Sequence, residues 1–228
     1  MHRNCIRLLR EGLQILGLEA QREVEEKIVC YLTEIERWNR RFNLVKAHGE
    51  DLVVRHLLDS LVALPLIREL DLRESIADVG SGAGFPGIPL ALFMPESSFS
   101  LIERSSKKSE FLRNVLAILG LKNTRVLEID LKQLARQPAE HAFDVTLFRA
   151  LTKLSDPLFG LLSRITQENG MILAYKGRYR QIREELTAAK GICGESSIIP
   201  VVVPFLNQER HLVLIRKADS SSLVENAF

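Results

Sequence analysis

The sequence has few cysteines, no long hydrophobic run and little net charge. Only Cys5, Cys30 and Cys193 occur among 228 residues. They are odd in number and form no C-x-x-C pair, so neither a disulfide framework nor a zinc cluster is expected, and we expect no metal. No run approaches the ~20 apolar residues of a membrane span, and the start, Met-His-Arg-Asn-Cys, has no apolar signal-peptide core. We therefore expect a cytoplasmic protein with no membrane partner.

The overall composition is that of an ordinary globular protein. Charged residues make up 26% and hydrophobic residues 46% of the chain, and the formal net charge is +2. Because the chain is nearly neutral, a nucleic-acid partner would need basic residues gathered in one patch. The length suits one domain with an appendage, and the size favours a monomer.

A glycine-rich stretch at residues 75–90 organises the chain. Ile76, Ala77 and Val79 are small or β-branched, as a strand buried on both faces requires. Glycines follow at positions 80, 82, 84 and 87, where the backbone can turn tightly and come close to a ligand. Residues 88–92 predict a short helix. Strand, glycine loop and helix together predict the first unit of a nucleotide-type α/β site.

The residues around this loop indicate its ligand. Residues 82–87 satisfy the G-x-G-x-x-G dinucleotide pattern, which alone is a weak signal. Asp78 lies two positions before the first glycine, and Asp-x-Gly-x-Gly-x-Gly resembles motif I of class I S-adenosylmethionine (AdoMet) methyltransferases. A second strand at 99–104 ends in Glu103, which can accept hydrogen bonds from both ribose hydroxyls. The alternative is that Asp78 caps a turn and Glu103 is a solvated strand end.

Residues 1–74 are expected to be helical. Apolar residues recur at spacings of three and four over residues 24–42, as on one face of an amphipathic helix. Residues 51–62 predict a second helix, in which Arg55 and Asp59 share a face and can pair. Three arginines close the first helix, and they either complement its dipole or contact a nucleic-acid backbone: Arg37, Arg40 and Arg41.

The rest of the chain alternates strands with helices. Strands are expected at residues 124–130, 143–150, 171–176, 198–203 and 211–215, and helices at 107–119, 154–165 and 178–190. The last two strands have no helix between them and should pair antiparallel. The sequence thus predicts an α/β fold, the Rossmann-like seven-stranded sheet of class I methyltransferases with an antiparallel last strand pair. We expect an N-terminal helical extension (1–74), an AdoMet-dependent methyltransferase domain (75–217) and a flexible tail (218–228).

Several strand ends bring polar residues to one edge of this sheet. The third strand ends in Asp130, followed by Leu131 and Lys132, and the fourth and fifth strands end in Arg149 and Lys176. Ligands of α/β folds bind outside the carboxyl ends of the strands. In the class I methyltransferases that this fold resembles, the edge near residues 130–132 holds the adenine.

Several blocks together resemble one family, the small-subunit ribosomal RNA methyltransferases G, also called glucose-inhibited division protein B. The blocks run in order through residues 37–44, 54–60, 78–90, 107–113, 149–150, 175–177 and 209–213. The resemblance implies transfer of a methyl group from AdoMet to N7 of a guanine in 16S ribosomal RNA near the decoding region, within the small ribosomal subunit. It implies cofactor contacts at Gly80, Phe85, Glu103, Leu131, Lys132 and Arg149. The family often has Arg-x-Glu at residues 130–132 and Leu at Phe85.

Methyl transfer to guanine N7 does not require acid–base catalysis by the protein. Guanine N7 carries a free lone pair, so it can attack the sulfonium methyl without losing a proton and no general base is needed. The candidate catalytic residues are Arg149, which we expect to bind the cofactor carboxylate or an RNA phosphate, and Lys176, which we expect to bind a phosphate. The alternative for both is an ordinary ion pair with Asp78 or Asp130.

The remaining candidates divide into two sets. The cofactor-binding set is Asp78, Gly80, Gly82, Gly84, Phe85, Gly87, Glu103, Asp130, Leu131, Lys132 and Arg149. The RNA-binding set is Arg37, Arg40, Arg41, Arg55, His56, Arg210 and His211. Three alternatives stay open: a class I methyltransferase acting on a small molecule or a protein, a binder without turnover, and an NAD-dependent oxidoreductase.

Overall fold

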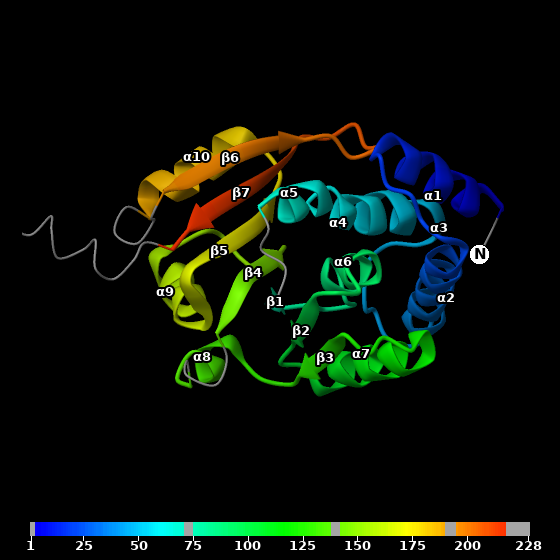
Figure 1. The fold of residues 1–228 in the computed structure, drawn as a ribbon, viewed down its shortest axis with the longest axis horizontal. Helices are drawn as coiled ribbons and strands as arrows, with labels where there is room; N and C mark the ends of the chain where they lie inside the picture. The colour runs from blue at the N-terminus through cyan, green and yellow to red at the C-terminus, as the bar shows by residue number, and fades with distance from the viewer. Residues whose placement is uncertain (1–2, 71–74, 138–141, 190–194, 218–228) are drawn as a thin grey trace, which may run out of the picture.

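A computed structural model describes residues 3–70, 75–137, 142–189 and 195–217. Its centre is a seven-stranded sheet with the strand order β3-β2-β1-β4-β5-β7-β6 (Figure 1). The first five strands pair in parallel, whereas β7 is antiparallel to both β5 and β6. The expected class I methyltransferase sheet is thereby confirmed. The strands are β1 (Ser75–Val79), β2 (Ser98–Ile102), β3 (Thr124–Leu127), β4 (Phe143–Arg149), β5 (Thr166–Lys176), β6 (Ser196–Val201) and β7 (Arg210–Arg216).

Helices cover both faces of the sheet. The N-terminal part is helical as expected, with α1 (Arg3–Ile15), α2 (Arg22–Asn39), α3 (Gly49–Leu52), the π-helical segment η1 (Val53–Leu58), α4 (Asp59–Leu61) and α5 (Leu64–Glu69). The later helices are α6 (Gly87–Phe93), α7 (Ser106–Leu119), α8 (Leu131–Leu134), α9 (Asp156–Ile165) and α10 (Tyr179–Ala188). Gly120 ends α7 in the left-handed conformation, with φ 62°. Within the described residues no helix has both the length and the hydropathy needed to cross a bilayer.

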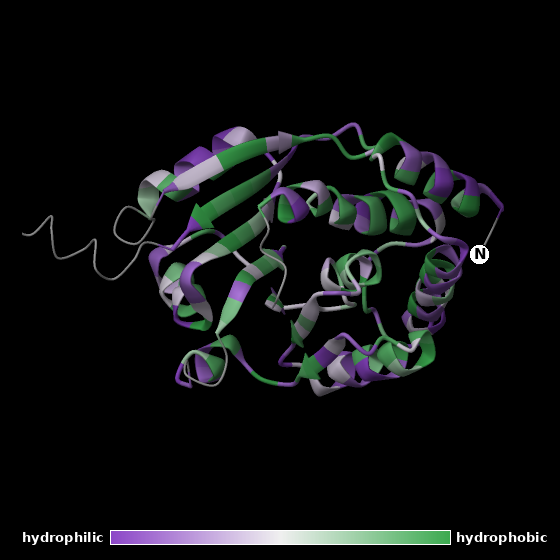
Figure 2. Ribbon diagram, in the orientation of Figure 1, coloured by the Kyte–Doolittle hydropathy of each residue, from purple (hydrophilic) through white to green (hydrophobic). Residues whose placement is uncertain are grey.

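The alternation of side chains along the strands builds two cores. In β5, Leu173 and Tyr175 face the larger core, which they share with α1 to α7, while Ile172 and Ala174 face the core formed with α8, α9 and α10. The N-terminal helices therefore pack on the sheet through a shared core. Figure 2 shows the strands at the centre as largely hydrophobic, while the surrounding helices alternate hydrophobic and hydrophilic residues.

Some predicted boundaries shift. The third strand ends at Leu127 rather than at residue 130, because Asp130 instead caps α8 by accepting a hydrogen bond from Lys132 N at 2.8 Å. Asn169 and Gly170 lie inside β5 rather than in a loop before it, and Asn169 has φ 63°. The expected tail at 218–228 lies outside the described residues.

The predicted helix at 51–62 is not a continuous α-helix. Residues 53–58 form η1, whose wider turn changes which residues share a face. The predicted pair of Arg55 with Asp59 is therefore wrong. Arg55 Nε instead contacts Asp51 Oδ1 at 2.8 Å, and Asp59 is free to turn toward the sheet.

The antiparallel strand brings a distant part of the chain to the ligand-binding edge. Lys176, at the carboxyl end of β5, pairs in register with His211, near the start of β7. Residues 210 and 211 consequently reach the same edge as Arg149 at the end of β4 and the glycine loop that follows β1. This edge includes the switch point between β1 and β4, where open α/β sheets bind ligands.

Candidate active site and nucleic-acid interface

The glycine loop after β1 has a backbone that its glycines make possible. Gly80, Gly82 and Gly84 have φ of 73°, 61° and 95°, values that side chains with a Cβ rarely adopt. Gly80 N and Ser81 N both donate to Ile102 O, at 2.8 and 3.1 Å. The loop is therefore held across the end of β2 and presents its backbone to the adjoining space.

Asp78 lies beneath this loop and is fully buried. Its Oδ2 accepts a hydrogen bond from Gly87 N at 2.9 Å, which ties β1 to the start of α6. Its Oδ1 has no hydrogen-bond partner among the described residues. Burial raises the pKa of Asp78 to about 7, although the Gly87 hydrogen bond and Arg149 lower it. The carboxyl therefore does cap a turn through Oδ2, while Oδ1 accepts no hydrogen bond from the described residues.

Glu103 is engaged by the backbone and is not a solvated strand end. It is 6% exposed. Its Oε2 accepts from Gly82 N at 3.0 Å and its Oε1 from Ser105 N at 2.9 Å. Because an ionised carboxylate offers about four lone-pair sites, Glu103 can still accept two further hydrogen bonds.

A cavity of about 470 Å³, which we name the glycine-loop cavity, adjoins these groups. Its volume suits a small-molecule ligand. Polar and charged side chains of Glu103, Arg104, Lys108, Asp130 and Lys132 line it together with Gly80 and Ala150, and apolar side chains such as Ile102, Leu131 and Leu151 complete the wall. Of the predicted cofactor residues, Gly80, Glu103, Asp130, Leu131 and Lys132 line this one cavity.

Phe85 joins the glycine loop to the N-terminal helices. Its ring centroid lies 5.2 Å from those of Tyr31 and His56, and the Arg149 guanidinium carbon lies 5.3 Å from it. Tyr31 Oη also donates to Ala83 O at 2.7 Å, and burial raises the pKa of Tyr31 well above its usual value. Phe85 is 5% exposed, so in this structure it packs mainly against protein.

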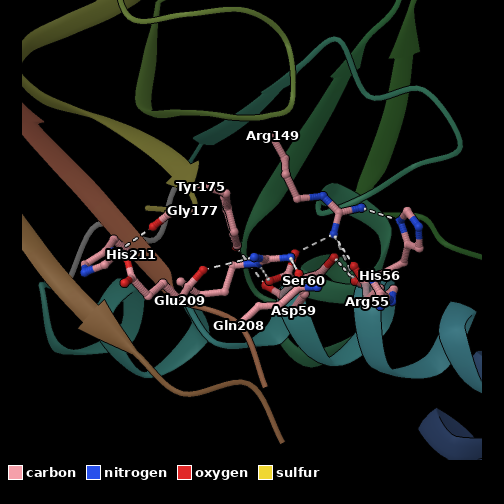
Figure 3. A network of polar contacts seen from close by, with 11 residues as sticks. Arg55, His56, Asp59, Ser60, Arg149, Tyr175, Gly177, Gln208, Glu209 and His211 are labelled. Carbon is pink, nitrogen blue, oxygen red and sulfur yellow. Dashed lines mark hydrogen bonds and ion pairs between the residues drawn. The ribbon is translucent and has the colours of Figure 1, made fainter. Parts of the chain in front are cut away.

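Asp59 is the centre of a polar network at the ends of β4 and β7 (Figure 3). Its Oδ2 accepts from Arg149 Nη1 at 2.9 Å, and its Oδ1 accepts from Arg210 Nε at 3.0 Å. The side chains of Asp59, Arg149 and Arg210 are 7%, 13% and 23% exposed. One buried carboxylate therefore holds two arginines that are far apart in the chain, and the group keeps a net positive charge.

The π-helical segment supplies further partners to Arg149. Arg149 Nη1 also donates to Arg55 O and His56 O, at 3.3 and 3.4 Å, and Nη2 lies 2.9 Å from His56 Nδ1. Because a guanidinium has only donors, Nδ1 must be the acceptor, and the His56 proton lies on Nε2. Burial, followed by the charge of Arg149, lowers the pKa of His56 to about 4. His56 is therefore neutral near pH 7.

Lys176 has a different carboxylate partner. Its Nζ lies 2.8 Å from Glu185 Oε2 and 3.1 Å from Thr152 O, and Glu185 Oε2 also accepts from Leu154 N. Arg149 and Lys176 do form ion pairs, but with Asp59 and Glu185, not with Asp78 or Asp130. His211 Nδ1 lies 2.6 Å from Gly177 O. These contacts fix the backbone after β5 against β7 and α10.

A second cavity, which we name the arginine cavity, lies over this network. Its volume is about 370 Å³. Its charged lining has more cations than carboxylates: Arg55, Arg149, Lys176, Arg178 and Arg210 against Asp59 and Glu185. His56 also lines it. Ala150, with φ 54°, lines both this cavity and the glycine-loop cavity. The end of β4 therefore separates a cationic cavity from a cavity with a nucleoside-type lining.

The predicted RNA-binding residues divide between two places. Arg55, His56 and Arg210 meet at the arginine cavity, and His211 lies beside it. Arg37, Arg40 and Arg41 instead line another cavity of about 540 Å³ between the end of α2 and α7, with Trp38 and Phe42. Lys107 Nζ lies 3.6 Å from the Phe42 ring centroid there. The described residues contain no group of three or more His, Cys, Asp or Glu that could hold a metal ion.

Sequence reasoning missed three residues that shape the site. Helical spacing predicts Asp59 as a local partner of Arg55, although an acid inside the apolar run Leu57-Leu58-Asp59-Ser60-Leu61 is a signal of buried pairing. Glu185 and Tyr175 gave no comparable signal. Tyr175 Oη donates to Ser60 O at 2.7 Å, and this contact connects the sheet to α4.

Comparison with known proteins matches the chain to a single family, by its profile and by several relatives. The profile of the family described as rRNA small subunit methyltransferase G matches residues 24–213. The ribosomal RNA small subunit methyltransferase G of Treponema pallidum is 41% identical over 191 residues, which cover 81% of this chain and 82% of the relative. The proteins of the same name from Methylobacillus flagellatus and Actinobacillus succinogenes are 38% and 32% identical, with 91% and 95% of this chain covered and 96% and 100% of theirs.

Solved structures show the same fold. A putative O-methyltransferase from Klebsiella pneumoniae superposes with a TM-score of 0.58 at 14% identity, over 93% of this chain and 97% of that one. A predicted O-methyltransferase from Agrobacterium tumefaciens gives a TM-score of 0.54 at 26% identity, over 72% and 80%.

Proposed function

Because the chain belongs to the rRNA small subunit methyltransferase G family, we propose that it transfers a methyl group from AdoMet to N7 of a guanine in 16S ribosomal RNA, near the decoding region. The substrate is the RNA within the small ribosomal subunit. The observation that carries this proposal is the pair of cavities that meet at Ala150, one suited to a nucleoside cofactor and the other cationic.

The residues of the glycine-loop cavity fit AdoMet. Glu103 retains acceptor capacity for ribose hydroxyls, and Leu131 with its apolar neighbours suits an adenine ring. Gly80 has φ 73°, a conformation that side chains with a Cβ rarely adopt, so glycine at this position keeps the loop against the cavity. Asp130 has a second carboxylate oxygen, Oδ2, that is not used in capping α8 and lies 3.8 Å from Arg104 Nη1. Asp78 is buried beneath the loop and outside the cavity lining, so its role would be to support the loop rather than to line the cavity. When bound, AdoMet supplies the methyl group on its sulfonium.

The reaction needs positioning more than proton transfer. Guanine N7 has a free lone pair and loses no proton on methylation. Holding the acceptor in line can supply roughly 7–11 kcal/mol of the barrier reduction. This agrees with the state of His56, which is neutral and already accepts a hydrogen bond from Arg149. Arg149 and Lys176 act here as cations fixed at the strand ends, where they orient an anionic group of the RNA or of the cofactor.

The RNA would contact two surfaces. Arg55, His56 and Arg210 line the arginine cavity, next to the methyl-transfer position, and His211 lies beside it. Arg37, Arg40 and Arg41 lie at the end of α2 and supply a second, more peripheral contact for phosphates. Because the target base belongs to folded RNA, it must be exposed in a loop or splayed out to enter the cavity.

Transfer of labelled methyl groups tests the proposal. The protein is incubated with methyl-labelled AdoMet and either 16S RNA, small subunits or a panel of small acceptors. Label in RNA alone is expected, and Arg149→Ala should abolish AdoMet binding or turnover. Label in small acceptors alone would contradict the RNA assignment. AdoMet binding without any labelled product would indicate a binder, and NAD binding in place of AdoMet would indicate an oxidoreductase.

A further inference from the structure

The connection between β6 and β7 exposes an aromatic side chain, that of Phe205, although the residues directly before it are buried. Phe205 is 48% exposed, whereas Val203 is 2% exposed and Pro204 is also buried. Leu206 packs against the larger core, and its N–H donates to Val203 O at 3.1 Å. The connection is therefore anchored on both sides of Phe205, and this ring alone among these four residues points substantially into solvent.

The backbone at Phe205 is strained in order to hold this position. Its φ is 65°, in the left-handed region that a bulky residue rarely adopts. Such outliers persist only where the surroundings determine them, and they concentrate at sites of function. The anchored neighbours and the strained backbone together hold the ring in one place, as a preformed contact surface requires.

Phe205 lines a cavity of about 670 Å³, which we name the Phe205 cavity. Leu8 and Val54 contribute apolar surface to it from α1 and η1. Its polar lining consists mainly of amides and carboxylates, with one histidine and one arginine: His48, Glu50, Asp51, Arg55, Asn207 and Gln208. The two carboxylates disfavour a phosphate, whereas a flat aromatic ring beside hydrogen-bonding groups of both kinds suits a nucleobase and its edge.

The Phe205 cavity continues into the proposed RNA interface. Arg55 lines both the Phe205 cavity and the arginine cavity. Gln208, from the first cavity, accepts from Arg210 Nη2, from the second, at 3.4 Å. A nucleotide whose base lies on Phe205 would therefore have its phosphates close to Arg55 and Arg210. This continuity favours RNA over a protein as the occupant.

We propose that Phe205 and the cavity beside it bind an unpaired nucleobase of the ribosomal RNA by stacking, at a nucleotide near the methyl acceptor but distinct from it. The inference rests on the proposed function, because it extends the same RNA interface. It identifies a second, aromatic contact that supplements the arginines and tolerates different bases.

The test measures binding of single-stranded RNA oligonucleotides that carry a central 2-aminopurine, a base whose fluorescence is quenched on stacking. Phe205→Asn removes the ring, and asparagine tolerates the left-handed backbone. We expect it to raise Kd at least about fivefold and to remove the quenching. Phe205→Tyr keeps the ring and should stay within about twofold of wild type. Ile118→Ala, at a 46% exposed residue of α7, should change nothing. In Figure 1, α7 lies at the bottom of the molecule and the connection between β6 and β7 at the top.

The outcomes separate this inference from the proposed function. Unchanged Kd and quenching in Phe205→Asn would overturn the inference, as would a wild-type protein that binds no oligonucleotide. A rise in KM on assembled subunits with unchanged oligonucleotide binding would assign the surface to a protein contact and also overturn it. Absence of methyl transfer by the wild type would instead contradict the proposed function, while oligonucleotide binding would still report on Phe205.

Discussion

The burial of Asp78 makes the stability of the protein depend on pH. The folded pKa of Asp78 is about 7, raised by burial from an ordinary value of 3.8. Between these two values the folded protein holds a proton that the unfolded chain has released. The contribution of Asp78 to stability is therefore fully present below about pH 4 and is lost as the pH rises through about 7.

The variant Asp78→Asn tests this account. Its amide does not titrate, so the stability of the variant relative to wild type should rise with pH by up to about 1.4 kcal/mol per pH unit between pH 4 and 7. AdoMet affinity should fall at the same time. Urea denaturation at several pH values measures the first effect and calorimetry the second. A constant difference in stability from pH 4 to 8 would show that Asp78 is ionised throughout.

Asp59 should matter far more than a neighbouring acid on the same segment. Asp59→Asn leaves Arg149 and Arg210 without their shared buried carboxylate, and we expect a loss of about 3 kcal/mol in unfolding free energy. Asp51→Asn is the matched control, because Asp51 pairs with Arg55 at an exposed position and should change stability by less than about 1 kcal/mol. Chemical denaturation compares the two variants. Equal effects would remove Asp59 from the centre of the network.

At the level of elements, the packing of α1 on η1 depends on the absence of a side chain. A Cβ at Gly12 would collide with the Leu58 side chain, while a Cβ at Gly160, in α9, would meet no atom within 4 Å. Alanine favours a helix over glycine by about 1 kcal/mol. Gly160→Ala should therefore stabilise the protein by up to about 1 kcal/mol, and Gly12→Ala should destabilise it by about 1–3 kcal/mol.

Thermal unfolding of these two glycine variants provides the measurement. The expected result is a higher Tm for Gly160→Ala and a lower Tm for Gly12→Ala than for wild type. If Gly12→Ala were as stable as Gly160→Ala, α1 would not be packed closely on η1.

The strands were largely predictable from the sequence, whereas the π-helical segment was not. Local periodicity identifies a buried strand such as β1 and the acid that follows β2, because both signals lie within a few residues. Nothing in the sequence of residues 53–58 distinguishes a π-turn from an α-turn. In the folded chain Arg149, about ninety residues away, donates to the carbonyl oxygens of Arg55 and His56, a contact that the local sequence does not show. The pairing of Arg55 with Asp59 was wrong because the π-turn was not predicted.

The candidate site was also predictable only in part: the residues of the glycine-loop cavity were, but most contacts of the cationic residues were not. The residues of the glycine-loop cavity follow consecutive strand ends, so the topology alone places Gly80, Glu103 and Asp130 together. The partners of Arg149 and the residues beside Phe205 come largely from elements distant in sequence, and only the folded chain shows them. Lys176 differs, because its partner Glu185 lies only nine residues further along, in the next helix. Each of the predicted contact roles remains a prediction until it is tested by substitution.

For the whole molecule, the two arginine surfaces should contribute to RNA binding through charge. Each phosphate contact that is lost should reduce the slope of log Kd against log salt concentration by about one. The double variant Arg40→Ala/Arg41→Ala should therefore reduce the slope by about two, while the rate at saturating RNA changes little. Filter binding over a range of salt concentrations measures the slope. An unchanged slope would exclude the end of α2 from the RNA interface.

Identification of the methylated nucleoside tests the central claim most directly. Small subunits and naked 16S RNA are methylated with labelled AdoMet, digested to nucleosides and separated. The proposed chemistry, which needs a free lone pair and no general base, predicts that the label elutes as 7-methylguanosine. Label in any other nucleoside would keep the fold and the cofactor but contradict the assignment to guanine N7.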